Sequence, residues 1–438
     1  MATNGGAGTS ASNPRHGRLR RSNSWANIGR LLLTTAIVVV LSGIATVSYS
    51  LLGLFNDVKT VELGGAGDVA QAVGLGSSSI EGELTVLLVG TDSRVGQTLD
   101  DGEEGELNDV NLLLHVSADH QRATVVSFPR DLMVPVPSCP GPNGEPNYYS
   151  AMSEQQLNST LGVGGLPCVV ATISELTGMD IPYAGMITFD GVIGVSNALG
   201  GIDVCLAQPI YDEYTGLDLP AGVNNLVGGE ALQFLRTRHG VGDGGDTSRI
   251  SNQQVFMSAL VRELKSADTL SDPAKVYGLA KAGIENMTLS SNMATMSFMQ
   301  QVAGTVKDID LESINFVQYP SATHPYEAGR LTPDRVAAQT LFDVLKSGQA
   351  FDVTAVGEGV ADTTAEVPVD PATDPNAVVD PNAPVDPNAE VDPNAVADPN
   401  APATTDPTVD PNAPVQLPST ITGQRADTQT CSQGRTVF

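Results

Sequence analysis

Residues 31–55 carry no charged side chain over 25 consecutive positions, and most of them are apolar. At about 1.5 Å per residue, a helix of that length spans the roughly 30 Å hydrocarbon core of a bilayer. Residues 1–30 contain five arginines and no acidic residue. This charge asymmetry predicts a cytoplasmic basic tail (1–30), a single transmembrane helix (31–55) and a remainder outside the cell membrane. A cleaved signal peptide is the alternative; the long apolar core without a small-residue cleavage pattern favours an anchor.

Three other segments differ in composition from a folded domain. Residues 56–82 include a Gly- and Ser-rich stretch and are expected to form a flexible stalk. Residues 351–418 hold thirteen acidic residues and no Lys or Arg, and DPNA recurs within them. Pro and Asp at that density build no core, so this part is expected to be a disordered acidic linker. Residues 419–438 change character again and are expected to form a C-terminal tail.

Residues 83–350 are expected to form an α/β domain, because strand-like and helix-like patterns alternate along them. Short apolar runs predict strands at 85–90, 110–117, 123–128 and 313–320. Helical patterns cover 150–178 (with a break at 162–167), 228–238, 273–308 and 332–348, the last with Pro333 near its start, whereas 189–206 predicts a helix, a Gly-Gly turn and a strand. Polar residues follow several of the strands, at the sheet edge where open α/β folds bind ligands.

The sequence RTRHGVGDGGDTSRISNQQ at 236–254 is the most informative motif. Arg236 and Arg238 precede a glycine-rich turn, and a helix is expected to follow it. Asp246 or Thr247 is the expected N-cap of that helix.

Arg249 and Gln253 lie four positions apart and so share one face of this helix. Guanidinium groups and free backbone N–H groups near a helix N-terminus bind anions, above all phosphate. The alternative is an ordinary salt-bridged surface helix. Arg262, further along the same helix and outside the motif, is expected to matter little.

The chain has four cysteines, at Cys139, Cys168, Cys205 and Cys431. A location outside the membrane favours disulfides, and four cysteines allow three pairings. No CxxC or Cys/His spacing indicates zinc. If Cys431 pairs with a cysteine of the domain, it pins the tail to the domain; the alternative is a free thiol on a loose tail.

The formal net charge is −28, and an acidic chain argues against nucleic acid as a partner. The few arginines therefore stand out. If the strand and helix ends that carry Arg130, Arg236, Arg238 and Arg249 meet at one sheet edge, their charges repel one another unless a polyanion is bound.

Several of these segments together resemble the LytR–CpsA–Psr family in its actinobacterial form: LLVGTDSR (87–94), NDVNLLLHV (108–116), VVSFPRD (125–131), GGID (200–203), LPAG (219–222) and GGEALQFLRTRHGVGDGGDTSRISNQQ (228–254). The resemblance covers roughly 83–350. It implies a membrane-anchored enzyme that transfers a glycopolymer from a polyprenyl (pyro)phosphate carrier to peptidoglycan, forming a phosphodiester. The implied fold is a three-layer α/β/α sandwich with a central mixed sheet and an apolar groove for the lipid.

The resemblance also assigns roles to residues. The metal-site aspartates of the family fall on Asp92 and Asp109. Its pyrophosphate-binding arginines fall on Arg130, Arg236, Arg238 and Arg249, and its polar partners on Gln253 and Asp246. Leu107 departs from the pattern, because many members have an arginine there; Arg94 is a candidate replacement.

Transfer between phosphate oxygens requires neutralised charge and aligned groups. Arg130 and Arg249 are expected to neutralise the phosphate charge, together with a divalent cation, Mg²⁺ or Mn²⁺, that is held by carboxylates and waters. The acceptor hydroxyl is expected to lose its proton to Asp92 or Asp131. The alternative for Asp131 is an ion pair with Arg130 or a helix cap.

Two other functions remain open at this point. The same site would serve a polyprenyl-diphosphate pyrophosphatase if water replaced the sugar hydroxyl. A surface-tethered wall-binding or adhesion protein is the non-enzymatic alternative, although a passive stalk needs no arginine cluster. The sequence leaves the identity of the polymer and the oligomeric state undetermined.

Overall fold

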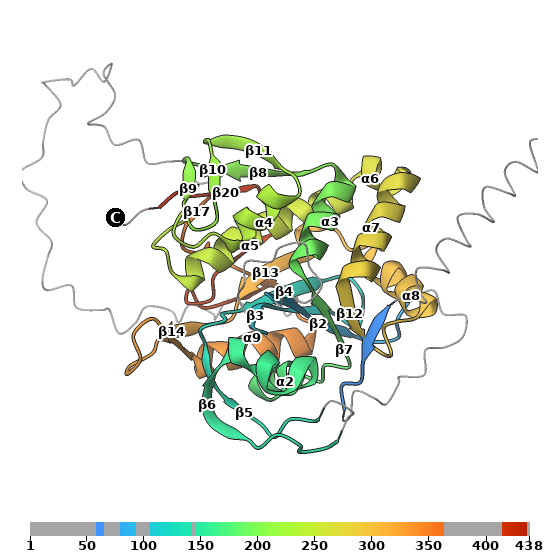
Figure 1. Cartoon of the computed structure of the whole chain (residues 1–438), viewed down its shortest axis with the longest axis vertical. Helices are drawn as coiled ribbons and strands as arrows, with labels where there is room; N and C mark the ends of the chain where they lie inside the picture. The colour runs from blue at the N-terminus through green and yellow to red at the C-terminus, as the bar shows by residue number, and fades with distance from the viewer. Residues whose placement is uncertain (1–57, 65–78, 93–105, 142–144, 363–413, 436–438) are drawn as a thin grey trace, which may run out of the picture. The chain divides into compact units, whose positions relative to one another are not determined.

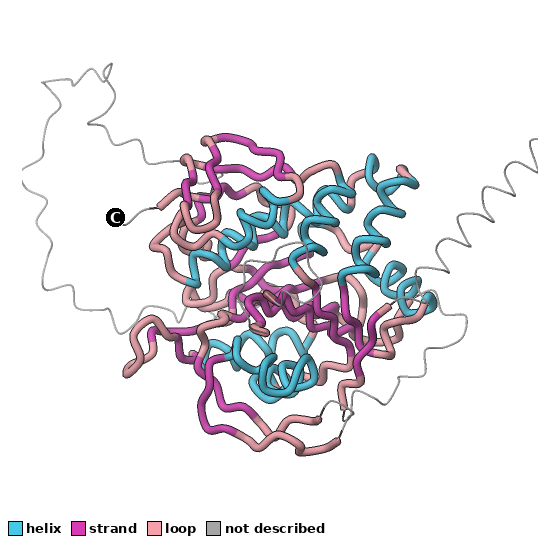
Figure 2. Tube along the Cα trace, viewed as in Figure 1, coloured by secondary structure: helices cyan, strands magenta, loops and turns pink. Residues whose placement is uncertain are grey.

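The computed structural model describes residues 58–64, 79–92, 106–141, 145–362 and 414–435 (Figures 1 and 2). The expected cytoplasmic tail (1–30) and transmembrane helix (31–55) lie outside these residues, as does the whole DPNA repeat. Within the described part, one helical segment, Leu157–Thr177, is long and apolar enough to cross a membrane. Leu166, Val169 and Ile173 of that segment are buried in the core of the domain.

The largest sheet contains β1 (Lys59–Val61), β2 (Leu84–Thr91), β3 (Asn108–Val116), β4 (Ala123–Phe128), β7 (Tyr183–Ile187), β12 (Met287–Ser290), β13 (Ile314–Gln318) and β19 (Gly423–Arg425). Their order is β1-β12-β7-β2-β3-β4-β13-β19. The pairs β1/β12, β2/β7 and β4/β13 are parallel and the others antiparallel. The carboxyl ends of β2, β4, β7 and β13 therefore share one edge with the start of β3.

The helices are α2 (Thr160–Thr177), α3 (Phe189–Leu199), α4 (Gly229–Arg236), α5 (Asp246–Leu264), α6 (Ala267–Ser271), α7 (Pro273–Asn286), α8 (Met296–Val306) and α9 (Arg335–Ser347), with 3₁₀ turns η2 (Leu157–Ser159) and η3 (Leu311–Ser313). Figure 1 shows α2 and α9 on one side of the sheet and α3, α5 and α7 on the other. The expected mixed α/β fold is confirmed.

The central strands are apolar on both faces because both faces are covered. Leu87, Leu113 and Val126 pack in one core with residues of α2 and α9. Val86 and Phe316 belong to a second core on the opposite face, with residues of α5 and α8. Alternate side chains of each strand thus enter different cores, as the period of two requires.

A four-stranded sheet lies beside the main one, with β11 (Gly222–Leu226), β8 (Ile202–Leu206), β20 (Thr430–Ser432) and β17 (Val360–Asp362) in that order. Four two-stranded pairs complete the strands: β5 (Met133–Val136) with β6 (Met152–Gln156), β9 (Ile210–Asp212) with β10 (Leu217–Leu219), β14 (Ser321–Thr323) with β15 (Leu331–Pro333), and β16 (Phe351–Asp352) with β18 (Val415–Gln416).

The folded unit extends past 83–350 on both sides. β1 comes from the expected stalk, and β16, β17 and β18 come from the expected linker. Beyond the repeat, β19 pairs with β13 and β20 pairs with β17. Backbone hydrogen bonds to neighbouring strands explain why these polar or short segments are ordered: each completes a sheet that would otherwise expose its edge.

Both disulfides form within the described residues: Cys139 bonds to Cys168, and Cys205 bonds to Cys431. The second bond joins positions 226 apart in the chain and attaches β20 to β8. The tail is therefore pinned to the domain, and no cysteine is free.

Two of the expected helices are partly strand. Residues 152–156 of the expected helix 150–178 form β6, because they pair with β5. The expected break is present, since Gly164 and Gly165 have non-helical backbone angles. Residues 287–290 of the expected helix 273–308 form β12, which fills the position between β1 and β7.

The start of α9 differs from the expectation. Pro333 lies in β15, and Asp334 caps the helix by accepting from the backbone N–H groups of Val336 and Ala337. The Asp334 carboxylate thus satisfies two of the N–H groups that a helix start leaves without intrahelical partners. The helix ends at Gly348 in the left-handed conformation, as its position in the sequence predicts.

Candidate functional site

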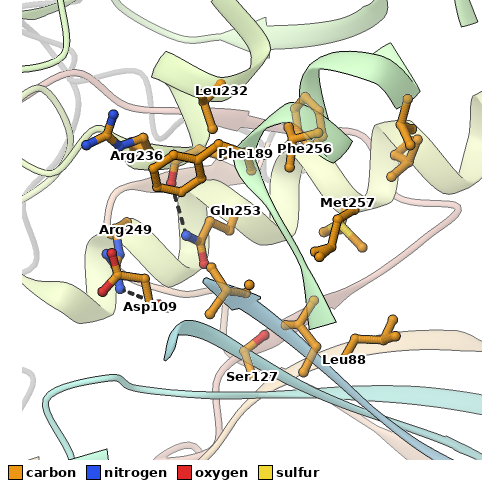
Figure 3. A pocket seen from close by; sticks show the side chains of 18 of the residues that line it. Leu88, Asp109, Ser127, Phe189, Leu232, Arg236, Arg249, Gln253, Phe256 and Met257 are labelled. Carbon is orange, nitrogen blue, oxygen red and sulfur yellow. Dashed lines mark hydrogen bonds between the residues drawn. The ribbon is translucent and has the colours of Figure 1, made fainter. Parts of the chain in front are cut away.

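A cavity of about 580 Å³ lies between the main sheet and helices α3, α4 and α5 (Figure 3). Its floor includes Leu88, Leu112 and Ser127 of the strands. Its polar lining gathers at one end, with Asp109, Arg130, Asp212, Arg236, Arg238, His239, Arg249 and Gln253. The rest of the wall is apolar and includes Phe189, Val195, Leu232, Phe256, Met257, Leu260, Leu264, Leu279 and Phe316.

A β-bulge aims Asp109 into the cavity. In the pairing of β2 with β3, Gly90 faces Val110 and Thr91 faces Asn108, so Asp109 is the extra residue. A bulge places two successive side chains on the same side of the strand. Asp109 and Val110 accordingly both line the cavity.

Hydrogen bonds on the opposite face of β3 fix the position of the bulge. The side chains of Asn108 and Asn111 are buried and hydrogen-bond to each other at 2.8 Å. Asn108 Oδ1 also accepts from the backbone N–H of Leu161 in α2, at 3.1 Å.

Arg130 follows β4 at the same sheet edge. Its Nη1 donates to Asp109 Oδ1 at 2.5 Å, and its backbone N–H donates to Asp246 Oδ2 at 3.0 Å. Burial acts to lower the pKa of Arg130, but the adjacent Asp109 carboxylate, together with Asp131 and Asp246, raises it above its usual value. The guanidinium is therefore held charged beside the bulge.

The motif 236–254 folds as a helix end, a tight turn and a helix start. Gly242 has φ +48°, and a Cβ there would collide with the side chain of Ser248, so the turn requires glycine. Gly245, rather than Asp246 or Thr247, is the N-cap of α5. The carboxylate of Asp246 is used elsewhere, because it binds Arg249 and the backbone of Arg130.

Arg249 is the most deeply buried cation of the group. Its side chain is 5% exposed, and its Nη2 lies 2.7 Å from Asp246 Oδ1 and donates to the carbonyl oxygen of Asp109 at 3.0 Å. Burial lowers its pKa, against the opposing charges of Asp246 and Asp109. Arginine stays protonated even so, because its ordinary pKa lies far above neutral pH.

Side chains of α5 also fix the end of α4. Gln253 Nε2 donates to the carbonyl oxygen of Leu235 at 3.0 Å, and Asn252 Nδ2 donates to that of Phe234 at 2.8 Å. These bonds satisfy carbonyl groups that a helix end leaves without intrahelical partners. They hold Arg236 and Arg238 at a set distance from Arg249.

Asp131 is buried and lies within ion-pair distance of three arginines. Arg130 Nε is 3.8 Å from its Oδ2, so the expected alternative of an ion pair with Arg130 is present. Arg238 Nη2 lies 3.0 Å from its Oδ2, and Arg330 Nη1 lies 2.7 Å from its Oδ1. Gln156 also donates to Oδ1. Arg330 was not predicted, because a lone arginine that is 199 positions from Asp131, in the loop before β15, carries no local sequence pattern.

Arg236 lies against a ring rather than a carboxylate. Its guanidinium carbon is 4.7 Å from the centroid of the Phe189 ring (Figure 3). No ion pair of Arg236 with another described residue is present. Phe189 is a second residue that the sequence analysis missed, since a phenylalanine at the start of an apolar helix is indistinguishable from a core residue.

The expected repulsion between the arginines is balanced within the protein. Asp109, Asp131 and Asp246 lie between them and pair with Arg130, Arg238 and Arg249. Even so, the buried Nε atoms of Arg130, Arg238 and Arg249 have no hydrogen-bond partner among the described residues. With Arg236 and Arg330, five guanidinium groups face four carboxylates, those of Asp109, Asp131, Asp212 and Asp246, so the polar end retains positive charge for an anion.

The remaining predicted residues lie differently. Asp92 follows β2, accepts from the backbone N–H of Leu107 at 2.9 Å and does not line the cavity. Arg94 lies outside the described residues. No group of three or more His, Cys, Asp or Glu side chains among the described residues would hold a metal. Asp92 and Asp109 therefore fit Mg²⁺ only as a partial set that phosphate oxygens and waters would complete.

The chain is similar in sequence to a known protein family and to proteins of cell wall biosynthesis. The LytR_cpsA_psr family model matches residues 60–345. The chain is 28% identical over 295 residues to the cell wall biosynthesis protein LcpA of Corynebacterium glutamicum, a match that covers 61% of this chain and 55% of LcpA. The chain thus spans about half the length of that relative.

Two further similarities are more distant. Identity is 25% over 238 residues to the polyisoprenyl-teichoic acid–peptidoglycan teichoic acid transferase TagU of Enterococcus faecalis, covering 54% of this chain and 72% of TagU. The structure of a LytR-Csp2A-Psr enzyme from Actinomyces oris aligns with a TM-score of 0.48 at 20% identity, over 66% of this chain and 96% of that one.

Proposed function

The chain belongs to the LytR_cpsA_psr family, and we propose that it transfers a glycopolymer from a polyprenyl (pyro)phosphate carrier to peptidoglycan. The observation that carries this proposal is the cavity: arginines gather at one end of it and apolar side chains line the rest. A lipid-linked diphosphate has the same two parts in the same order. The relatives named for cell wall biosynthesis and teichoic acid transfer support the class of reaction.

The arginines are proposed to bind the diphosphate. Arg130, Arg236, Arg238 and Arg249 line the polar end of the cavity. Charge-assisted hydrogen bonds from guanidinium groups match phosphate oxygens in geometry and charge. The apolar wall along α5 would take the polyprenyl chain, forming the lipid groove.

The proposed reaction is a substitution at phosphorus. The oxygen of a peptidoglycan hydroxyl attacks the phosphorus nearest the glycan and forms the new phosphodiester. The bond from that phosphorus to the bridging oxygen breaks, and polyprenyl phosphate leaves. Arg130 and Arg249 stabilise the charge that develops on the leaving oxygens.

The acceptor proton requires a base. Asp131 is held by Arg238 and Arg330, so we assign it the role of positioning these arginines. Asp92 follows β2 and does not line the cavity, so we propose it as the base for a hydroxyl that approaches from the end of β2. A Mg²⁺ or Mn²⁺ ion beside Asp92 and Asp109 would supply further neutralisation of phosphate charge.

The transfer assay tests the proposal. The purified full-length protein is mixed with peptidoglycan sacculi and with a polyprenyl-diphosphate-linked glycan that is radiolabelled in the sugar. Label attached to the sacculi is the expected result. Label released as free glycan phosphate, with none on the sacculi, would instead establish the pyrophosphatase. If the labelled lipid is neither transferred to the sacculi nor hydrolysed, the enzymatic proposal is overturned.

The non-enzymatic alternative makes a different prediction. An adhesion protein that acts through its acidic repeat should lose wall binding when residues 363–413 are deleted. A transferase should keep most of its activity after that deletion, because β17, β18, β19 and β20 all remain. The proposed location is the cell membrane, with the N-terminal tail in the cytoplasm and the catalytic domain outside.

A further inference from the structure

Two rings form a small platform at the polar rim of the cavity. Tyr214 lines the cavity although it is 75% exposed. Its ring centroid lies 4.5 Å from that of His239, which also lines the cavity. Thr215, beside Tyr214 in the turn between β9 and β10, lines the same rim. What distinguishes Tyr214 from Tyr211 and Tyr326, which are also exposed, is that its ring lines the mouth of the cavity beside a second ring.

A buried carboxylate couples this platform to the arginines. Asp212 Oδ1 accepts from the backbone N–H of Tyr214 at 3.0 Å. Asp212 Oδ2 accepts from Thr237 Oγ1 at 2.6 Å and from the backbone N–H of Arg238 at 3.2 Å. The Asp212 residue is 2% exposed. One fixed group therefore sets the position of the platform relative to the backbone of Arg238.

The order of side chains along α5 gives the cavity a direction. Arg249 lies near the start of this helix, Phe256 in its middle and Leu264 at its end. At 1.5 Å per residue, Arg249 and Leu264 are separated by roughly 22 Å. Figure 1 shows β9 and β10 near the start of α5 and α7 near its far end. Along this direction, the cavity therefore presents the apolar wall first, then the arginines and then the aromatic platform.

We propose that Tyr214 and His239 bind the first sugar attached to the diphosphate, as a pyranose site next to the arginines. This inference rests on the proposed function, because the diphosphate fixes where that sugar emerges. One face of a pyranose carries axial C–H groups, which pack on an aromatic ring whose face has negative potential. The sugar hydroxyl groups would point outward, toward Thr215 and solvent.

The platform is tested with two probes of equal charge. One is geranylgeranyl diphosphate esterified with N-acetylglucosamine; the other is the same lipid diphosphate esterified with methyl. Calorimetry measures the affinity of the full chain for each. The wild-type protein should bind the glycosylated probe more tightly, and Tyr214→Ala should reduce that advantage by roughly three- to tenfold.

The controls separate stacking from damage to the site. Tyr214→Phe keeps the ring and should keep the advantage. Tyr211→Ala removes a neighbouring tyrosine that is 67% exposed and does not line the cavity, and it should change nothing.

Each contrary result has a definite meaning. If the wild-type protein binds both probes equally, or if Tyr214→Ala weakens both equally, the platform is not a sugar site, although the diphosphate site stands. If the wild-type protein binds neither probe, this inference and the proposed function both fail.

Discussion

Arg249 donates from Nη2 to the backbone carbonyl oxygen of Asp109 at 3.0 Å, across 140 positions of the chain. The bond joins the first turns of α5 to the bulge of β3. Both groups lie in the cavity wall, and Asp246 holds the same guanidinium from the other side. Any ligand that binds the arginines therefore binds a frame that already links the sheet to the helix, rather than two independent surfaces.

Replacing Arg249 with lysine should reduce transfer by about ten- to a hundredfold, although the charge is kept. A lysine ammonium cannot reach Asp246, the Asp109 carbonyl and a phosphate oxygen with the planar fork of a guanidinium. The measurement is the rate of label transfer to sacculi, with folding checked by thermal melting.

The matched control for this substitution is Arg122→Lys. Arg122 precedes β4, at the opposite end of the strand from Arg130, and pairs with Asp119 at the surface. Arg262 is unsuitable as a control, contrary to the sequence-based expectation, because its Nη1 donates to the carbonyl oxygen of Ala426 at 2.7 Å and so holds the tail. Equal small losses in Arg249→Lys and Arg122→Lys would mean that the cluster only supports the fold and does not bind the substrate.

Asp212→Asn should be most destabilising at neutral pH. Burial raises the pKa of Asp212, but hydrogen bonds from Thr237, Tyr214 and Arg238 prevail and lower it. A depressed folded pKa stabilises the fold above the unfolded value of about 3.9, and that contribution is lost as pH falls through the folded pKa.

Urea unfolding from pH 7 to pH 2 measures this dependence. The free energy of unfolding of the variant should lie below that of the wild type by about 1–3 kcal/mol at pH 7, and the gap should narrow below about pH 4. A gap that stays constant with pH would show that the carboxylate charge contributes nothing.

The disulfides should differ in their effects. Thiol labelling of the denatured, unreduced protein should find no free cysteine. Replacing Cys205 and Cys431 together with serine should cost about 2–5 kcal/mol, and more than replacing Cys139 and Cys168, because the closed loop is longer. The sequence separations are 226 and 29.

Loss of the Cys205–Cys431 bond should also reduce transfer. Val241 forms a backbone bridge with Gly434, and Arg435 Nη1 donates to the carbonyl oxygen of His239, so the tail supports the turn between the arginines. If activity survives when both cysteines are replaced and the protein remains folded, the tail has no part in positioning this turn.

Chelation of divalent cations should abolish transfer, and Mg²⁺ or Mn²⁺ should restore it. Asp92→Asn and Asp109→Asn should each raise the Mg²⁺ concentration needed for half-maximal rate, because each removes one carboxylate from a partial set. Full activity in the presence of excess chelator would remove the metal from the proposal.

A reporter fused after Phe438 tests the membrane topology. The arginines of residues 1–30 and the uncharged span at 31–55 predict reporter activity only outside the membrane. Cytoplasmic activity of the fusion would contradict access to a polyprenyl-linked substrate on the outer face.

Local patterns predicted the central strands, because each strand depends on a short run of residues. Short motifs at the ends of strands and helices likewise predicted that the distant arginines converge. The continuous apolar run that forms β2 and the helix–Gly-Gly–strand order at 189–206 are examples. β12 was missed because its four residues follow α7 directly, and only its pairing with β1 and β7 makes it a strand. Such pairing has no signal in the segment itself.

The candidate site shows the same limit. Arg130, Arg236, Arg238 and Arg249 were found from the motifs and line one cavity. The partners that set their geometry were not all found: Arg330 reaches Asp131 from a distant hairpin, and Tyr214 and Phe189 contribute rings without any motif. Contacts that depend on tertiary placement of single residues leave no periodic trace in the sequence.

The position of β19 and β20 in the chain determines when, during synthesis, the site can be completed. Both strands, and Cys431 with them, follow the whole acidic repeat. A ribosome must therefore make that repeat before β13 gains its outer neighbour or Cys205 its partner. Until then the turn between the arginines lacks its support from Gly434. A nascent chain would thus carry an unfinished site, and it would acquire a finished one only after synthesis has passed the repeat.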